Sequence, residues 1–296
     1  MRRGIALLIT LLFIMLITIS IGIGFKQLNQ ASAYVEGEKF LYQSSVILDD
    51  VLNILKNSKE LQDINSSAEL NVFLSESSII PFEANGIKVS IELSSARSRF
   101  NINSLVSGNI PNQKRVESLK QYVSNYMVIT RYVDILLSSM GINQEDISYN
   151  SDLFDKKPNL FREYIVSEKH LLELNEYYTN YYHEDSLKNI DFAKLFYYSS
   201  DKDYEIDLSF ATAEVWEMIL GCSKQRAIEL SSGFYDSIAD IGLSKEEMSM
   251  LDRFDTNPFE PYIDVRLSII QDKQSANIRF EYDIENNKGS NFVYEI

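Results

Sequence analysis

The first 57 residues carry the longest hydrophobic pattern of the chain. Residues 5–25 form an uncharged, mostly apolar run of 21 residues. A helix of that length rises about 30 Å, at about 1.5 Å per residue, which matches the hydrocarbon core of a bilayer. From Leu28 to Leu55, apolar residues recur at spacings of three to seven, as on an amphipathic helix. The pattern therefore predicts one helix over residues 5–57, of which residues 5–25 cross a membrane.

The flanking residues bear on how this segment is processed. A secretory signal would be removed, and the Ala-Ser-Ala sequence at 31–33 fits such a cleavage site, but a signal's apolar part is normally about 7–15 residues long. A plain signal anchor is the second interpretation. In the third, the basic pair before Gly4 and the apolar run after it resemble a prepilin-type leader, residues 1–4, cleaved to leave Ile5 as the first mature residue. The amphipathic continuation favours the third interpretation, because pilins have such a helix.

The two basic residues at the start also predict the orientation. Arg2 and Arg3 precede the apolar run, and positive charge beside a membrane span stays on the cytoplasmic side. We therefore expect a single-pass inner-membrane protein with its C-terminal bulk in the periplasm.

Beyond residue 57 the pattern changes to strands, then helices, then strands again. Alternation of apolar and polar residues predicts the strands, whereas longer apolar periods between polar or glycine-containing joints predict the helices. The strands are expected at 87–93, 99–105, 263–269, 278–284 and 291–296. The helices are expected at 113–140, 162–178, 186–198, 212–220, 224–231 and 245–253.

This order predicts an α+β fold in which a long N-terminal helix packs on a small antiparallel sheet. Strands on both sides of a helical block suggest one sheet interrupted by a large inserted helical domain. The expected divisions are 58–110 for the first part of the sheet, 111–260 for the inserted domain and 261–296 for the C-terminal strands.

Several motifs resemble one family. The start Arg3-Gly4-Ile5-Ala6-Leu7-Leu8, the motif Arg99-Phe100-Asn101-Ile102-Asn103-Ser104-Leu105 and the segment Ala211-Thr212-Ala213-Glu214-Val215 occur in that order. Together they are similar to the K minor pseudopilins of type II secretion. In that family the second motif closes an early strand of the sheet, so the resemblance gives Arg99, Phe100, Asn101, Asn103 and Leu105 a structural role.

The resemblance implies a non-catalytic subunit at the tip of a short periplasmic pseudopilus, which helps to initiate its assembly for protein export. Its expected partners are other minor pseudopilins, inner-membrane assembly proteins, the prepilin peptidase, the membrane and, further, secreted cargo. Methylation of the mature N-terminus is part of the same expectation. The fifth mature residue would be Ile9, where most pilins carry a glutamate.

The chain also departs from the family. Ser95-Ala96-Arg97 stands where an acidic pair usually precedes the second motif, and the acidic Asp-Trp segment of the insert is missing around residues 147–155. These departures put the family's calcium binding in doubt for this chain. Carboxylates do alternate at Asp201, Asp203, Glu205 and Asp207, but the segment lacks the glycine and the final glutamate of an EF-hand loop. A solvated acidic loop and a weak calcium site both fit it, and no other cofactor is expected.

The amino-acid composition narrows the classes of function that fit this chain. The chain has 28 basic and 43 acidic residues, a net charge of −15, so a nucleic-acid partner is not expected. One cysteine, Cys222, and two histidines leave few catalytic arrangements, and His183 is expected to be a surface or packing residue. An enzyme is therefore disfavoured. The alternatives are a signal-anchored periplasmic ligand-binding or chaperone-like protein, and a minor pilin of a type IV pilus or DNA-uptake system.

Overall fold

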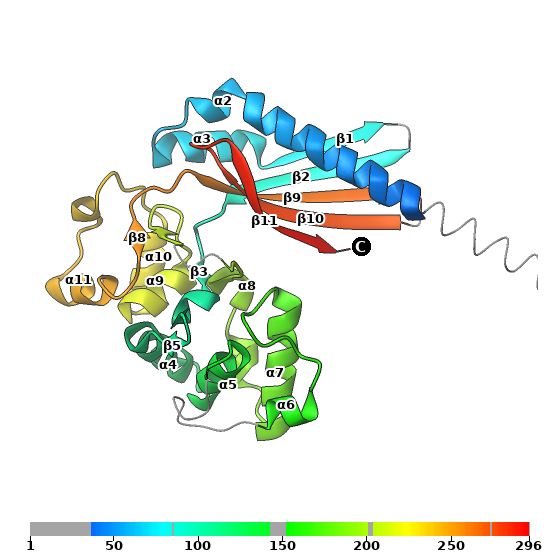
Figure 1. Cartoon of the computed structure of the whole chain (residues 1–296). Coiled ribbons are helices and arrows are strands. Elements are labelled where there is room, and N and C mark those ends of the chain that lie inside the picture. Colours follow the sequence, from blue (N-terminus) through cyan, green and yellow to red (C-terminus); the bar gives the residue numbers. More distant parts are fainter. Residues whose placement is uncertain (1–36, 85, 143–151, 201–203, 273, 296) are drawn as a thin grey trace, which may run out of the picture.

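A five-stranded antiparallel sheet is built from two distant parts of the chain (Figure 1). The computed structural model describes residues 37–84, 86–142, 152–200, 204–272 and 274–295. The strand order is β1-β2-β9-β10-β11, and each neighbouring pair is antiparallel. The strands are β1 (Ile79–Ala84), β2 (Ile87–Ser95), β9 (Tyr262–Gln271), β10 (Gln274–Asp283) and β11 (Lys288–Glu295).

The central pairing joins the strands that lie before and after the helical part of the chain. Val89 of β2 is opposite Ile269 of β9, and Leu93 is opposite Val265. The backbone N–H of Ala96 donates to the carbonyl of Tyr262 at 3.0 Å, which holds the two ends of the intervening segment together. The prediction that the early and late strands share one sheet is confirmed. We call residues 96–261 the helical region.

One face of the sheet is covered by a helix over residues 37–57, drawn in blue in Figure 1. Its buried residues are spaced three or four apart, so they lie on one side of the helix. Residues on the opposite side are exposed, whereas Leu48, Val51 and Leu55 on this side are buried. They belong to one apolar cluster with Leu267 and Phe280 of the sheet. This part of the predicted N-terminal helix is confirmed. After it come α2 (Lys59–Gln62) and α3 (Ser67–Ser77), both of which were not predicted.

The rest of the N-terminal prediction lies outside the described residues. That applies to the leader at 1–4, the apolar run at 5–25, and the positions Gly4, Ile5 and Ile9. Among the residues that the structure does describe, none of the helices combines the length and hydropathy that a bilayer span requires.

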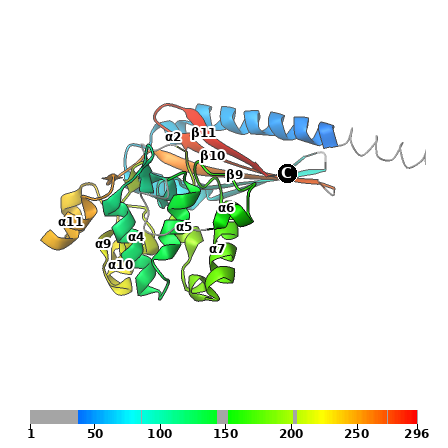
Figure 2. The ribbon, with the colours of Figure 1, turned by 60° about the horizontal axis from the view of Figure 1, so that its bottom comes forward.

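The helical region lies against the opposite face of the sheet, toward one end of it (Figure 2). Its helices of seven residues or more are α4 (Gln113–Asn125), α5 (Arg131–Ser139), α7 (Glu168–Tyr182), α9 (Ala213–Leu220), α10 (Lys224–Ser231) and α11 (Lys245–Leu251). Its shorter pieces are β3 (Phe100–Asn101), η1 (Ile102–Leu105), β4 (Val106–Ser107), β5 (Ile110–Pro111), α6 (Leu153–Lys156), η3 (Ser186–Asn189), α8 (Phe192–Leu195), β6 (Phe196–Tyr197), β7 (Ile206–Asp207), η4 (Ile238–Ile241) and β8 (Thr256–Asn257).

The predicted helices differ from these in three places. The helix expected at 113–140 is two helices, because the backbone of Met127 takes a left-handed conformation with φ 63°. The helix expected at 162–178 begins only at Glu168, where the Ser167 hydroxyl accepts the backbone N–H of His170. The helix expected at 186–198 is broken into η3, α8 and the strand β6. The helices expected at 212–220, 224–231 and 245–253 are present within two residues.

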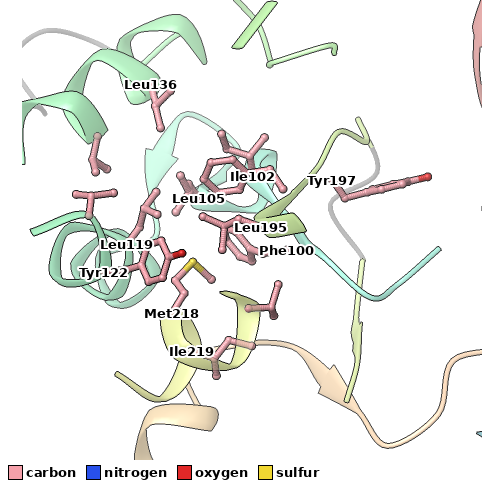
Figure 3. Close-up of a cluster of buried hydrophobic side chains, with 14 of the residues drawn as sticks. Phe100, Ile102, Leu105, Leu119, Tyr122, Leu136, Leu195, Tyr197, Met218 and Ile219 are labelled. Atoms are coloured by element: carbon pink, nitrogen blue, oxygen red, sulfur yellow. The ribbon is translucent and has the colours of Figure 1, made fainter. Parts of the chain in front are cut away.

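The boundary between the two parts also differs from the prediction. Residues 99–105 were expected to be a strand that closes the sheet, and residues up to 110 were assigned to the sheet. Instead, within 99–105 only Phe100 and Asn101 form a strand, which pairs in parallel with β6 of the helical region. The short strands β4 and β5 that follow pair with each other. Figure 3 shows Phe100, Ile102 and Leu105 packed among apolar side chains of that region. The chain therefore leaves the sheet at Ser95, about 15 residues earlier than predicted.

Candidate functional site

Buried charges lie in the contact between the sheet and the helical region. The guanidinium of Arg97 donates to Oε1 of Glu281 at 2.6 Å from Nη2 and at 3.1 Å from Nε. Only 4% of the Arg97 side chain and 1% of the Glu281 side chain are exposed. The same guanidinium lies over the rings of Tyr204 and Tyr262, at 4.4 and 4.0 Å from their centroids. Burial lowers the pKa of Arg97, but Glu281 and the tyrosines outweigh it and leave that pKa raised, so Arg97 stays ionised.

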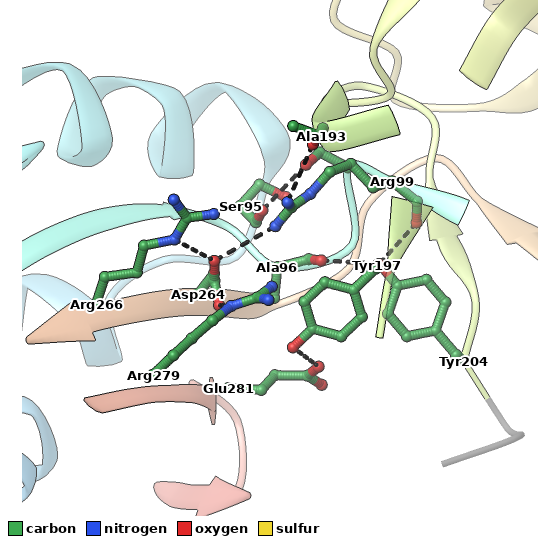
Figure 4. Close-up of polar contacts among 11 residues, drawn as sticks. Ser95, Ala96, Arg99, Ala193, Tyr197, Tyr204, Asp264, Arg266, Arg279 and Glu281 are labelled. Carbon is green, nitrogen blue, oxygen red and sulfur yellow. Dashed lines mark hydrogen bonds and ion pairs between the residues drawn. The ribbon is translucent and has the colours of Figure 1, made fainter. Parts of the chain in front are cut away.

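A second buried carboxylate, that of Asp264, is shared by three arginines (Figure 4). Nε of Arg279 lies 2.7 Å from Oδ1, whereas Nε of Arg266 and Nη2 of Arg99 lie 3.3 and 3.4 Å from Oδ2. Asp264 is fully buried and Arg99 is 11% exposed. Arg99 comes from the helical region and the other three residues come from the sheet, so this cluster also joins the two parts.

Two tyrosines complete the junction. The Tyr197 hydroxyl donates to Oε2 of Glu281 at 3.1 Å. The Tyr204 hydroxyl lies 2.8 Å from the carbonyl oxygens of Ala96 and Arg99, where the chain passes from the sheet into the helical region. Burial raises the pKa of both tyrosines well above the ordinary value, so they remain neutral donors.

The motif at 99–105 is a structural hub rather than a reactive site. The Asn103 side-chain amide donates to the carbonyls of Ile165 and Ser199, and its Oδ1 accepts the backbone N–H of Ile165 at 2.8 Å. Oδ1 of Asn101 accepts the backbone N–H groups of Asn103 and Ser199. Both asparagines are buried, so these bonds satisfy backbone groups that water does not reach. The motif thereby ties two other segments of the helical region, at Ile165 and Ser199, to the end of the sheet.

The acidic residues proposed as calcium ligands are only partly described. Asp201 and Asp203 lie outside the described residues. Asp207 is fully buried, and its two carboxylate oxygens accept the backbone N–H groups of Ser209 and Glu260 at 3.0 and 2.9 Å. The interpretation of a solvated acidic loop is therefore wrong at Asp207.

Glu260 lies beside this carboxylate, with Glu205 as a further neighbour. Burial raises the pKa of Asp207 to about 7, and burial, with a smaller effect from Glu205, raises the pKa of Glu260 to about 7. Within the described ranges, no three histidine, cysteine or acidic residues are grouped in a way that could hold a metal ion.

The other reactive side chains are not brought together. Cys222 is half-buried, burial raises the pKa of its thiol, and its Sγ lies 3.8 Å from the carbonyl of Trp216. His183 ends α7 in a left-handed conformation, whereas Cys222 follows the end of a different helix, α9. A thiol with a raised pKa is a poor nucleophile at neutral pH.

Sequence reasoning missed the charged cluster because the alternation of apolar and polar residues, which predicted the two strands, does not distinguish a buried charge from a solvated one. One signal was present. In the register of β9 and β10, Arg279 is directly opposite Arg266 and Glu281 is opposite Asp264. Like charges placed opposite each other are unfavourable unless a third element supplies partners. Arg97 and Arg99 of the neighbouring segment are the partners of the two acids, and Asp264 is the partner of the two opposed arginines.

Comparison with known proteins supports the fold. No family model and no curated protein sequence matches this chain. Its structure is similar to a chain in the crystal structure of the GspK–GspI–GspJ complex from the enterotoxigenic Escherichia coli type 2 secretion system, with a TM-score of 0.59. The sequences are 12% identical, and the match covers 90% of this chain and 98% of that chain. The chain thus has a GspK-like fold, which confirms the resemblance drawn from the motifs at the level of structure.

Proposed function

We propose that the protein is a non-catalytic minor pseudopilin that assembles with other pilin-like subunits through its N-terminal helix. The observation that carries the proposal is that the helix over residues 37–57 has apolar side chains on two sides, one buried and one exposed. One side of this helix is buried on the sheet, while Tyr42 and Val46 lie one turn apart on the other side and are 73% and 41% exposed. Exposed apolar side chains on a helix that is already packed indicate a partner for its free side.

The fold supports the same assignment. The GspK-like arrangement occurs in a complex whose other members are GspI and GspJ, so subunits of that kind are the proposed partners of this chain. We further propose that prepilin peptidase cleaves after Gly4 and that the apolar run anchors the chain in the inner membrane, with the described residues in the periplasm. Helping to initiate assembly for protein export is the role that follows.

A place at the tip is proposed on two grounds. A glutamate at the fifth mature position would pair with the N-terminal ammonium of a subunit ahead, since an unpaired charge in lipid costs several kcal/mol. This chain has Ile9 there and offers no such carboxylate, so it suits the first position. The helical region adds bulk that a subunit stacked above would have to avoid.

Site-specific disulfide crosslinking tests the helix interface. Tyr42→Cys and Val46→Cys, each in a Cys222→Ser background, should crosslink to cysteines on the helices of other pilin-like subunits. Ile110→Cys is the matched control, because Ile110 is 72% exposed but lies in the helical region. Equal crosslinking from Ile110→Cys, or none from the two helix positions, would contradict the proposal.

The processed N-terminus separates the remaining alternatives. A mature chain that begins at Ile5 supports a pseudopilin, and Gly4→Leu should then leave the leader attached. A chain that begins at Met1 supports a plain anchor, and one that begins at Tyr34 supports a secreted protein. Edman sequencing or mass spectrometry of the purified protein gives the answer.

A further inference from the structure

A pocket of about 320 Å³ lies between the polar face of the sheet and the helical region. Arg266 and Arg279 of the sheet line it on one side, and Arg99 and Tyr198 of the helical region line it on the other. It lies beside a groove of about 960 Å³ that is lined by residues 291–295 of β11, and Val293 and Glu295 line both spaces. The pocket is therefore reachable from solvent through the groove.

The three arginines around this pocket exceed their buried partner in charge. Asp264 is the one carboxylate with which they form ion pairs among the described residues, so three positive charges share one negative charge. Burial, and next the charge of Arg279, lowers the pKa of Arg99, an effect that Asp264 only partly offsets. Three exposed glutamates also line the pocket, so the excess of positive charge is confined to the three guanidinium groups that share Asp264.

Donors of two of these arginines are unused. Nη2 of Arg279 is buried and has no hydrogen-bond partner within the described structure. Arg266 contacts Asp264 through Nε alone, so both of its terminal nitrogens remain available in the described part of the chain, and its side chain is 48% exposed. A guanidinium presents a fork of donors whose geometry matches a carboxylate.

Three glutamates, Glu92, Glu168 and Glu295, also line the pocket. All three are exposed, and none of them forms an ion pair with the arginines. Glu92 is directly opposite Arg266 in the sheet, so its carboxylate competes for that guanidinium.

We propose that this pocket binds a carboxylate group, held by Arg266 and Arg279 with Arg99 at its back. The carboxylate comes either from an acidic side chain of a protein segment that enters along the β11 groove or from a free organic acid. This proposal is independent of the pseudopilin assignment, because it rests on the pocket alone and its test does not require fibre assembly.

The test is an NMR titration of the full-length chain with its arginines labelled at ¹⁵Nε. The probes are sodium acetate, the blocked peptide Ac-Ala-Ala-Glu-Ala-Ala-NH₂ and its glutamine counterpart, each against sodium chloride at equal ionic strength. We expect saturable shifts of the Nε–H signals of Arg266 and Arg279 with acetate, with a dissociation constant on the order of millimolar. A stronger effect of the glutamate peptide than of acetate identifies a protein segment as the source, and an effect of acetate alone identifies a free acid.

Substitutions at two exposed residues should change the affinity for a carboxylate in opposite directions. Arg266→Gln should weaken binding about tenfold, whereas Glu92→Gln should tighten it a few-fold because the competing carboxylate is gone. Glu83→Gln is the matched control, since Glu83 is an exposed glutamate of β1 at the other end of the sheet order. Shifts that are equal in chloride, absent up to 100 mM acetate, or unchanged in both Arg266→Gln and Glu92→Gln would overturn the proposal.

Discussion

The two faces of the sheet are built from the same strands but hold their neighbours in different ways. Under the N-terminal helix, β9 and β10 present Val265, Leu267 and Phe280, all fully buried in one apolar cluster. Toward the helical region, the alternate residues of the same strands, such as Asp264 and Glu281, are equally buried but charged. Apolar burial is non-directional and supplies most of the stabilisation, at roughly 25 cal/mol per Å².

The charged face orients the helical region on the sheet rather than adding net stability. Removing two ions from water costs several kcal/mol, and their attraction only offsets that cost when the geometry is good. Arg97 meets Glu281 in two hydrogen bonds and is held between two rings, so the helical region fits the sheet in one orientation. The apolar face therefore stabilises the sheet, whereas the charged face determines the orientation of the helical region on it.

Breaking one ion of the charged face should have the largest effect. Arg97→Met leaves Glu281 buried without its cation and should lower the free energy of unfolding by about 3–5 kcal/mol. The double variant Arg97→Met/Glu281→Met removes both charges and should regain at least half of that loss. Urea denaturation of each variant measures these differences. A double variant no more stable than the single one would show that the pair itself supplies stability.

A cavity in the apolar face should come next. Leu267→Ala removes a fully buried side chain between helix and sheet and should cost about 2–4 kcal/mol. Leu267→Met keeps the volume and should cost less than about 1.5 kcal/mol. If the two substitutions are equally harmful in the same urea measurement, this face depends on shape as strictly as the charged one does.

The junction should also make stability depend on pH. The raised pKa values of Asp207 and Glu260, about 7 in the folded chain, exceed the roughly 4 expected when it is unfolded. The folded state therefore binds more protons between these values, and the stabilisation is complete below pH 4 and is lost as the pH rises to 7. We expect the free energy of unfolding to decrease over this range, with contributions from both carboxyls.

Asp207→Asn cannot titrate and isolates that contribution. The slope of the unfolding free energy between pH 5 and pH 7.5 should be shallower in Asp207→Asn than in the unmodified chain. Glu163→Gln is a control, because Glu163 is exposed. An unchanged slope in Asp207→Asn would mean that this carboxyl titrates near its ordinary value.

The smallest effect is expected at the edge of the charged cluster. Arg266 is half-exposed and makes one long contact to Asp264, so Arg266→Gln should change the free energy of unfolding by less than about 1 kcal/mol. Arg279→Gln, at a mostly buried position with a 2.7 Å contact, should cost clearly more. Equal costs in thermal or urea unfolding would show that exposure does not rank these ion pairs.

The apolar face is the part that the sequence predicted best. Alternation along 263–269 and 278–284 identified β9 and β10, because one side of each strand is continuously apolar. The helix at 224–231 was predicted to the residue, since Ser223 caps it and its joints are polar. Those signals are local, and local signals can be found in one sequence.

The charged face was not predictable in the same way. Arg97 pairs with Glu281, 184 positions later, and no local pattern distinguishes a buried ion from a solvated one. The motif at 99–105 alternates like a strand, but the hydrogen bonds of Asn103 to Ile165 and Ser199 turn it into a short 3₁₀ helix. Tertiary contacts overrode local propensity there. The predicted leader residues Gly4, Ile5 and Ile9 remain predictions.

The hydrogen bond between Ala96 and Tyr262 has a consequence for the order of folding. Roughly 165 residues separate β2 from β9 along the chain. If they were a flexible loop, pairing the two strands would cost about 4.5 kcal/mol in chain entropy. A helical region that folds first brings its two ends within 3.0 Å and shortens that loop to a turn. Pairing of β2 with β9 would then start next to this hydrogen bond, where Ser95 is opposite Ile263, and proceed along the strands. Refolding of the sheet should therefore lag behind refolding of the helices.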